Sequence, residues 1–437
     1  MGRRAAGLAG LLIGLLVGLH AAPAPAQSPT ITRTRLSNGL TVLVRENPTA
    51  PVVGISLMVK MGTRWETTDN AGISNFVQLM MVRGTATRTG GQIVEAADAM
   101  GGGIEAVGDV DHSEIAATAL SRHWIEMLDL VADVALRPTM PQGVIGAVRD
   151  FLLRQVRNRS EKPYDVALDT LTARTFGRNP YAWDPIGLKE PLEKFDRDAL
   201  LAHYKRHYVP GGTVLAVSGR VKASEVLAQA NRLFGQMPSA PVPVALPPAP
   251  PAPAPWREVR VVPGAQAHIL MGALAPALTD PDHAAVKVLA TVLGGGMAGR
   301  FFSELRDRRG LAYTTGAQYP TRADTSYFVL QLGTAPENLA RAEAALREQL
   351  ERVGRERVSE AELRVAKAYL LGNLGMDRRT NARQAWYLAA YEEDAVGYEF
   401  LDRYVAAVRA VTATDVQRVA RRYLGVLRTV VVQPTAP

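Results

Sequence analysis

The sequence contains no cysteine among its 437 residues. This absence excludes disulfide bridges, thiolate zinc sites, a cysteine nucleophile and a cysteine-linked lipid anchor. The sequence also lacks a lysine- and arginine-rich cluster with interleaved aromatic residues, and its 50 Lys+Arg exceed its 42 Asp+Glu by only 8. Nucleic acid is therefore not an expected partner. Hydrophobic residues make up 47% of the chain and charged residues 21%, a balance typical of a globular protein of two or more domains.

Long hydrophobic runs are scarce as well. The uninterrupted apolar run Gly7–Leu19 has only 13 residues, too few for a helix that crosses a bilayer core about 30 Å thick. It follows Arg3 and Arg4 and precedes Ala24-Pro25-Ala26, which is the pattern of a cleavable signal peptide. We therefore expect residues 1–26 to direct export, to a bacterial periplasm, rather than to remain as a stable membrane anchor.

A proline-rich stretch divides the rest of the chain. Residues 238–256 read PSAPVPVALPPAPPAPAPW, a composition that excludes helix and central strand and favours a semi-rigid polyproline II spacer. We expect it to separate an N-terminal domain, residues 28–237, from a C-terminal domain, residues 257–437.

The two halves show a similar order of expected elements. The first half opens with alternating strands around Asn38-Gly39, which predicts a β-hairpin. The mixture of strands and helices predicts an α+β fold of two tandem, similar domains, each a mainly antiparallel sheet with helices packed on one face. Strands are expected at 52–61, 114–120, 213–218, 267–273, 312–318, 326–333 and 429–432, and helices at 71–82, 123–135, 141–159, 283–293, 300–309, 335–353 and 359–371.

One segment resembles a zinc-binding helix without its ligands. Residues 72–85 read GISNFVQLMMVRGT, similar to the G-x-A-H-F-L-E-H-M…G-T segment of the pitrilysin/insulinase metallopeptidase family. In that pattern two histidines bind zinc and the glutamate activates water. The resemblance puts Asn75, Gln78 and Leu79 at these positions, and Gln155 at the family's third ligand. Since amides are poor zinc ligands and leucine is none, we expect no metal or cofactor at this site, and we expect the three amides to hydrogen-bond one another or water.

A second segment keeps the family's pattern. Residues 293–313 read LGGGMAGRFFSELRDRRGLAY, similar to the family's L-G-G-G-x-x-S-R-L-F-x-E-L-R-x-x-x-G-L-A-Y segment. Gly310 is expected to end the helix, so that Arg306 and Tyr313 converge across the corner. The resemblance implies that Arg306 binds a substrate carbonyl and Tyr313 donates to the developing oxyanion. Residues expected to shape the substrate chamber are Gly294, Gly295, Gly296 and Arg300. Without such a role, Arg306 would form an ion pair with Glu304 or Asp307.

The combination implies a partner. Family members include pairs of two-domain subunits, related to the mitochondrial processing peptidase, in which one subunit holds zinc. We therefore expect this chain to be the non-catalytic subunit of a heterodimeric zinc endopeptidase that degrades or processes peptides, with zinc in a homologous partner that carries H-x-x-E-H. The alternative is an inert peptide-binding or scaffolding protein of the same fold. The paired His203 and His207 lack a nearby carboxylate, and the other histidines considered are isolated in the sequence, so no metal role is expected for His112, His123, His203, His207, His268 or His283.

Overall fold

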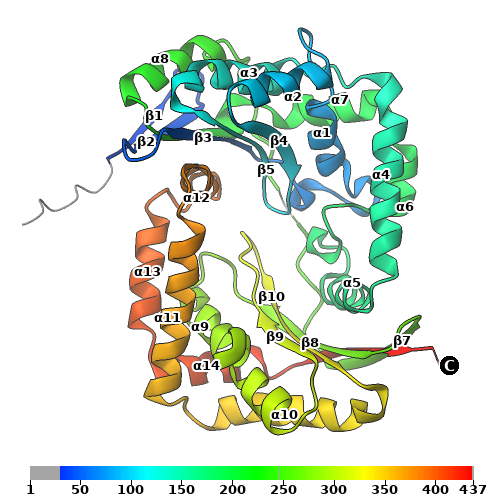
Figure 1. The fold of residues 1–437 in the computed structure, drawn as a ribbon. Helices are drawn as coiled ribbons and strands as arrows, with labels where there is room; N and C mark the ends of the chain where they lie inside the picture. The colour runs from blue at the N-terminus through cyan, green and yellow to red at the C-terminus, as the bar shows by residue number, and fades with distance from the viewer. Residues whose placement is uncertain (1–29, 246, 436–437) are drawn as a thin grey trace, which may run out of the picture.

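The computed structural model describes residues 30–245 and 247–435. The predicted signal peptide, residues 1–26, lies outside this part of the chain. The described residues form two sheets that face each other, each with its own layer of helices on the outer side (Figure 1). Within the described residues, no helix is both long enough and apolar enough to cross a membrane.

The N-terminal half contains a six-stranded sheet in the order β1-β2-β6-β3-β5-β4. β2 pairs in parallel with β6, and every other pairing is antiparallel. The predicted hairpin is confirmed: β1 pairs with β2, and Gly39 turns the chain with φ +99°, a value that suits glycine. The strands are β1 (Ile31–Arg35), β2 (Thr41–Glu46), β3 (Val52–Val59), β4 (Gly103–Gly108), β5 (Ser113–Leu120) and β6 (Thr213–Gly219).

Most helices of this half lie on the outer face of that sheet. The core between them is apolar throughout, with Leu57, Phe76, Leu128 and Leu215 almost completely buried. The helices are α1 (Ile73–Met81), α2 (Gly90–Ala99), α3 (Trp124–Leu136), α4 (Gln142–Ser160), α5 (Pro163–Phe176), α6 (Lys189–Lys194), α7 (Arg197–His207) and α8 (Ala223–Phe234).

The C-terminal half repeats the same topology. Its sheet has the order β7-β11-β8-β10-β9, and the last strand, β11, enters the sheet parallel to β7 and antiparallel to β8, as β6 does between β2 and β3. The strands are β7 (Trp256–Val262), β8 (Ala267–Ala275), β9 (Thr314–Gln318), β10 (Ser326–Thr334) and β11 (Arg428–Pro434), and the helices are α9 (His283–Gly294), α10 (Leu339–Arg355), α11 (Glu360–Asp377), α12 (Asn381–Glu393), α13 (Phe400–Ala410) and α14 (Ala413–Tyr423).

The two halves exchange one helix each. α12 of the C-terminal half packs on the inner face of the N-terminal sheet, and α5 of the N-terminal half packs on the inner face of the C-terminal sheet (Figure 1). The sequence predicted helices on one face only, so this second covering is an addition to that prediction. Around α12 the buried cluster joins Leu43, Met58, Val214 and Ala216 to Ala385, Leu388, Ala389 and Ala390, and around α5 it joins Leu270, Val329, Val430 and Val432 to Ala167 and Leu171.

The proline-rich stretch has no regular secondary structure in its described residues. It is held against the N-terminal half: Asn179 donates its side-chain amide to the carbonyl of Pro248 at 2.7 Å, and the indole of Trp65 donates to that of Pro243 at 3.3 Å. The linker therefore lies along a surface and is not a free tether.

Candidate functional site

Helix α1 is positioned by a buried carboxylate at its start. Gly72 occupies the N-cap with φ +95°, and the backbone N–H groups of Gly72 and Ser74 donate to Glu66 at 2.8 and 2.9 Å. The indole of Trp183 donates to the same carboxylate at 3.2 Å. An acceptor at this end satisfies N–H groups that have no partner within the helix. The helix that resembles the zinc helix is thus fixed firmly in the N-terminal half.

The side chains at the positions that correspond to the family's zinc ligands do not fit a zinc ion. Gln78 is completely buried and donates its amide to the hydroxyl of Tyr208 at 2.8 Å, while its carbonyl oxygen has no partner among the described residues. Leu79 packs against the apolar core. Asn75 on α1 and Gln155 on α4 are half-buried. An amide, a leucine and two further amides supply neither an imidazole nor a carboxylate, so no catalytic step can be assigned to these residues.

The predicted hydrogen bonds among Asn75, Gln78 and Gln155 are not observed in the described structure, where Gln78 has another partner. Gln78 bonds to Tyr208, which follows α7, and not to Asn75 or Gln155 in the described structure. Burial raises the pKa of Tyr208, so its hydroxyl remains a neutral donor and acceptor. The interior next to α1 is therefore a neutral hydrogen-bonded contact between two helical segments.

His203 and His207 of α7 are buried and engaged with their surroundings. The imidazole of His203 lies 3.0 Å from the hydroxyl of Ser74, and that of His207 lies 2.6 Å from the carbonyl of Lys60. Burial lowers the pKa of both side chains, that of His207 to about 4. The two rings are neutral and join α7 to α1 and to the residue that follows β3.

The Arg306 and Tyr313 side chains are both exposed. Arg306 lies in a π-helix, Phe302–Arg308 (η7), where the sequence predicted an α-helix, and its guanidinium stacks 4.9 Å from the centre of the Phe302 ring. Gly310 follows with φ +61°, as its predicted capping position requires. Tyr313 comes just before β9, its side chain is 55% exposed, and its N–H donates to the carbonyl of Gly333.

The alternative structural role for Arg306 is not observed. Among the described residues, Glu304 forms ion pairs with Arg308 and Arg352 instead, and Arg306 forms none. π-helical segments are uncommon and are frequently found at functional sites. Within the described residues, the positive charge of Arg306 is therefore available to a ligand or to a second chain.

The glycine loop and Arg300 have structural roles. A side chain at Gly294 would lie 2.0 Å from the backbone nitrogen of Ala317, so only glycine lets α9 approach β9 this closely. Arg300 is buried and donates to both oxygens of Glu362 at 2.6 and 3.2 Å. These hydrogen bonds lower the pKa of Glu362 to about 2. Of the residues expected to shape a chamber, Arg300 turns inward to anchor α11, while Gly295 approaches Thr291 and Gly296 approaches Tyr369.

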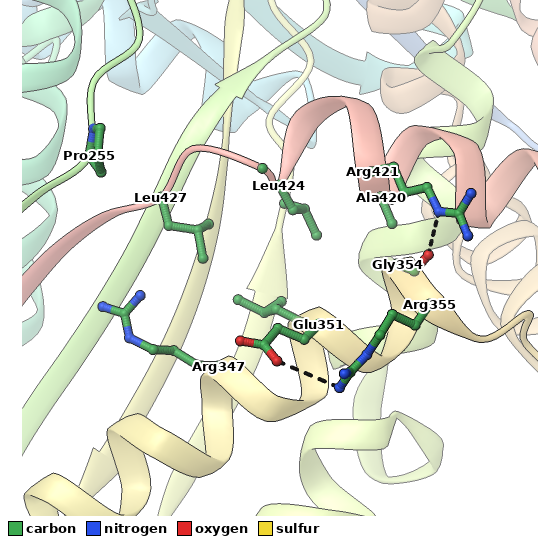
Figure 2. A pocket seen from close by; sticks show the side chains of 11 residues that line it. Pro255, Arg347, Glu351, Gly354, Arg355, Ala420, Arg421, Leu424 and Leu427 are labelled. Carbon is green, nitrogen blue, oxygen red and sulfur yellow. Dashed lines mark hydrogen bonds and ion pairs between the residues drawn. The ribbon is translucent and has the colours of Figure 1, made fainter.

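The surface has two hollows of interest, one beside the N-terminal sheet and one in the C-terminal half. One of about 270 Å³ lies beside the edge strand β4 and is lined by residues of β3, β4, β5 and α12, among them Glu105, Glu114 and Ala382. Another of about 630 Å³ lies between α10 and α14 (Figure 2), where Arg421 donates to the carbonyl of Gly354 and Arg355 pairs with Glu351. The second hollow contains none of the residues singled out from the sequence.

Family models match both halves of the chain. The model described as "Insulinase (Peptidase family M16)" matches residues 41–185, and the one described as "Peptidase M16 inactive domain" matches residues 194–370. The chain belongs to the insulinase family of M16 peptidases. An uncharacterized zinc protease of Mycobacterium leprae is 29% identical over 415 residues, which cover 91% of this chain and 90% of that protein. An uncharacterized zinc protease of Bacillus subtilis is 25% identical over 394 residues, covering 90% and 95%.

Solved structures of M16 proteins share the fold of this insulinase-family chain. A protease from Helicobacter pylori superposes with a TM-score of 0.87 at 20% identity, covering 93% of this chain and 100% of that one. A structure described as the peptidase M16 inactive domain from Pseudomonas fluorescens gives 0.85 at 22%, covering 93% and 98%. The predicted family and fold class are therefore confirmed.

Sequence reasoning missed the residues that line the space between the two halves. In the sequence His112 is an isolated histidine, and no motif points to Glu114, Glu393 or Asp394. Glu114 accepts a hydrogen bond from Ser56 at 2.5 Å, and burial raises its pKa to about 7. The only local signal is a histidine with acidic neighbours, Asp111 directly before it and Glu114 two positions after it.

Proposed function

We propose that this insulinase-family protein is the subunit without zinc ligands in a two-subunit peptidase, and that it contributes Arg306 and Tyr313 to the partner's zinc site. The observation that carries the proposal is the contrast between two places in one chain. The zinc positions hold Gln78, which is buried, and Leu79, which is partly buried against the core, whereas Arg306 and Tyr313 are exposed. Arg306 also has no acidic partner among the described residues.

The chemistry of the exposed pair suits a peptide substrate. A guanidinium and a phenol are hydrogen-bond donors, and donors placed where negative charge develops lower the barrier to peptide-bond attack. Because both side chains are exposed, they can contact a second subunit.

A peptide also needs a surface that binds extended chain. β4 is an edge strand, and within the described part of the chain no strand pairs with its outer N–H and C=O groups, so an extended peptide could add there. The hollow of about 270 Å³ beside it offers space for side chains. We also propose that the protein acts in the periplasm, as its N-terminal sequence predicts.

The test is co-expression of this chain with a homologous chain that carries H-x-x-E-H, followed by peptidase assays of each chain and of the pair. We expect activity only in the pair. Arg306→Ala or Tyr313→Phe should lower kcat/KM of the pair by about 10²–10³-fold for a lost oxyanion donor.

The matched control is Arg308→Ala, which removes an exposed arginine from the same π-helix that is already paired with Glu304. It should leave kcat/KM within about twofold, the scale of a surface change. If the partner is fully active alone, or if Arg306→Ala behaves as Arg308→Ala does, the proposal fails. The loss of all zinc ligands would then favour the peptide-binding or scaffolding alternative.

A further inference from the structure

A histidine and two carboxylates from distant parts of the chain meet where the two halves join. His112 lies in the turn between β4 and β5, which is closed by a hydrogen bond from the N–H of Asp109 to the carbonyl of His112 at 2.9 Å. Glu393 is the last residue of α12 and Asp394 caps it. Each of the three offers one ligand atom, and these atoms all lie within 4.8 Å of one another.

Two of these side chains are buried without a partner. Glu393 is 3% exposed and its Oε1 has no hydrogen-bond partner among the described residues. His112 is 9% exposed, and its Nδ1 is equally unpartnered within the described part of the chain. Buried polar atoms without partners are rare, because each one forfeits its hydration without compensation.

Among the described residues no cation forms an ion pair with Glu393 or Asp394, although Lys60, Arg64 and Arg322 act on Asp394 through space. Burial raises the pKa of Glu393, and burial followed by the nearby Asp111 raises that of Asp394 to about 7. Both residues lie at the C-terminal end of α12, where the helix dipole also disfavours negative charge. Arg64 acts on them through space, but it is bound to Asp324 at 2.7 Å.

The geometry points to a site for a divalent transition-metal ion of the zinc class, bound by His112, Glu393 and Asp394 at the junction of the two halves. One imidazole nitrogen and two carboxylate oxygens are ligands that zinc accepts, whereas magnesium and calcium prefer oxygen alone. Metal–ligand bonds of about 2.0–2.2 Å place ligand atoms about 3.3–3.6 Å apart in a tetrahedron, so small side-chain rotations close the site.

The surroundings leave room for a further ligand. A hollow of about 200 Å³ adjoins the cluster and is lined by His112 and Asp394 together with Asp111, Arg322 and Tyr391. Water can enter such a polar hollow and complete the coordination. Because His112 comes from the N-terminal sheet and the carboxylates from α12, the ion would connect the two halves directly.

The test uses the purified chain after treatment with a chelator, titrated calorimetrically with Zn²⁺ and, for comparison, Mn²⁺. We expect one equivalent of Zn²⁺ to bind. His112→Gln and Glu393→Gln should each weaken binding at least tenfold, because each removes a ligand. The matched control is His123→Gln, which removes a half-exposed imidazole beside Glu126 and should bind as the unchanged protein does.

Thermal unfolding supplies a second readout. Zn²⁺ should raise the unfolding midpoint of the unchanged protein in proportion to the logarithm of its concentration, and should not raise that of Glu393→Gln. The glutamine variant keeps the shape of the side chain and removes the buried acid, so it should fold without metal. An absence of saturable Zn²⁺ binding overturns the inference. It is also overturned if His112→Gln and Glu393→Gln bind Zn²⁺ as tightly as the unchanged protein does, because the ion would then lie elsewhere.

Discussion

The close approach of α12 to β3 gives a sharp prediction at Gly54. This residue lies in the middle of β3, and a Cβ there would be 2.4 Å from both the Cα and the nitrogen of Ala382 and 2.6 Å from the carbonyl carbon of Asn381. All three atoms belong to the backbone of α12. The substitution Gly54→Ala therefore requires the whole helix to move, since no side chain can rotate away.

The expected loss in the free energy of unfolding follows from the contacts that a displacement of α12 disturbs. Ordinary contact begins near 3.4 Å, so α12 must withdraw by about 1 Å. Asn381 then loses good geometry in two hydrogen bonds, to the carbonyl of Val52 at 2.7 Å and from the side chain of Asn47 at 2.9 Å. Overpacking costs about 1–3 kcal/mol and each bond about 1 kcal/mol. We expect a loss of about 3–5 kcal/mol in the free energy of unfolding.

Urea unfolding followed by circular dichroism measures this loss. The control is Gly146→Ala in α4, where an added Cβ meets nothing within 4 Å and should stabilise the helix by about 0.5–1 kcal/mol. If Gly54→Ala unfolds within about 0.5 kcal/mol of the unchanged protein, α12 does not lie flush on β3 in solution and the exchange of helices described above is wrong.

Three further predictions concern single side chains. Gly272→Ala in β8, where the glycine faces α5, should cost only about 1 kcal/mol in urea unfolding, because the clash at 2.6 Å is with the rotatable end of Leu171. Gln78→Glu should destabilise by at least about 2 kcal/mol at pH 8, and less at pH 5, since a carboxylate would be ionised in a fully buried position; equal unfolding midpoints at both pH values would contradict this. Glu114 has a folded-state pKa of about 7, above its ordinary value of 4.5, so the unchanged protein should lose stability as pH rises from 4.5 to 7. Glu114→Gln should remove that loss and unfold at a higher temperature than the unchanged protein at pH 8. If the unfolding temperatures of the two proteins change with pH in parallel, this prediction is refuted.

The sequence predicted the parts of the fold that depend on local chemistry. Asn38-Gly39 marked the hairpin between β1 and β2, and Gly310 marked the end of the helix before Tyr313, because positive φ values favour glycine. The similar order of elements in the two halves is matched by the repeated strand topology. These features are set by residues a few positions apart.

Features set by distant residues were not predictable in the same way. The π-helix over Phe302–Arg308 has a composition that suits an α-helix equally well. The exchange of α5 and α12 depends on which sheet each apolar face meets, although a glycine within a strand, such as Gly54, is a signal of close backbone approach. His112 and Glu393 are 281 positions apart in the sequence, so no spacing rule could join them.

The exchange of helices also affects how the protein is made. Residues of β6 are synthesised long before α12, so the inner face of the N-terminal sheet, with Leu43, Met58 and Val214, has no cover until residues 381–393 have left the ribosome. A fragment that ends at the proline-rich linker would keep that apolar face exposed to water, which promotes aggregation. The linker divides the sequence into two similar halves, but each half covers a face of the other's sheet, so neither half is a complete folding unit.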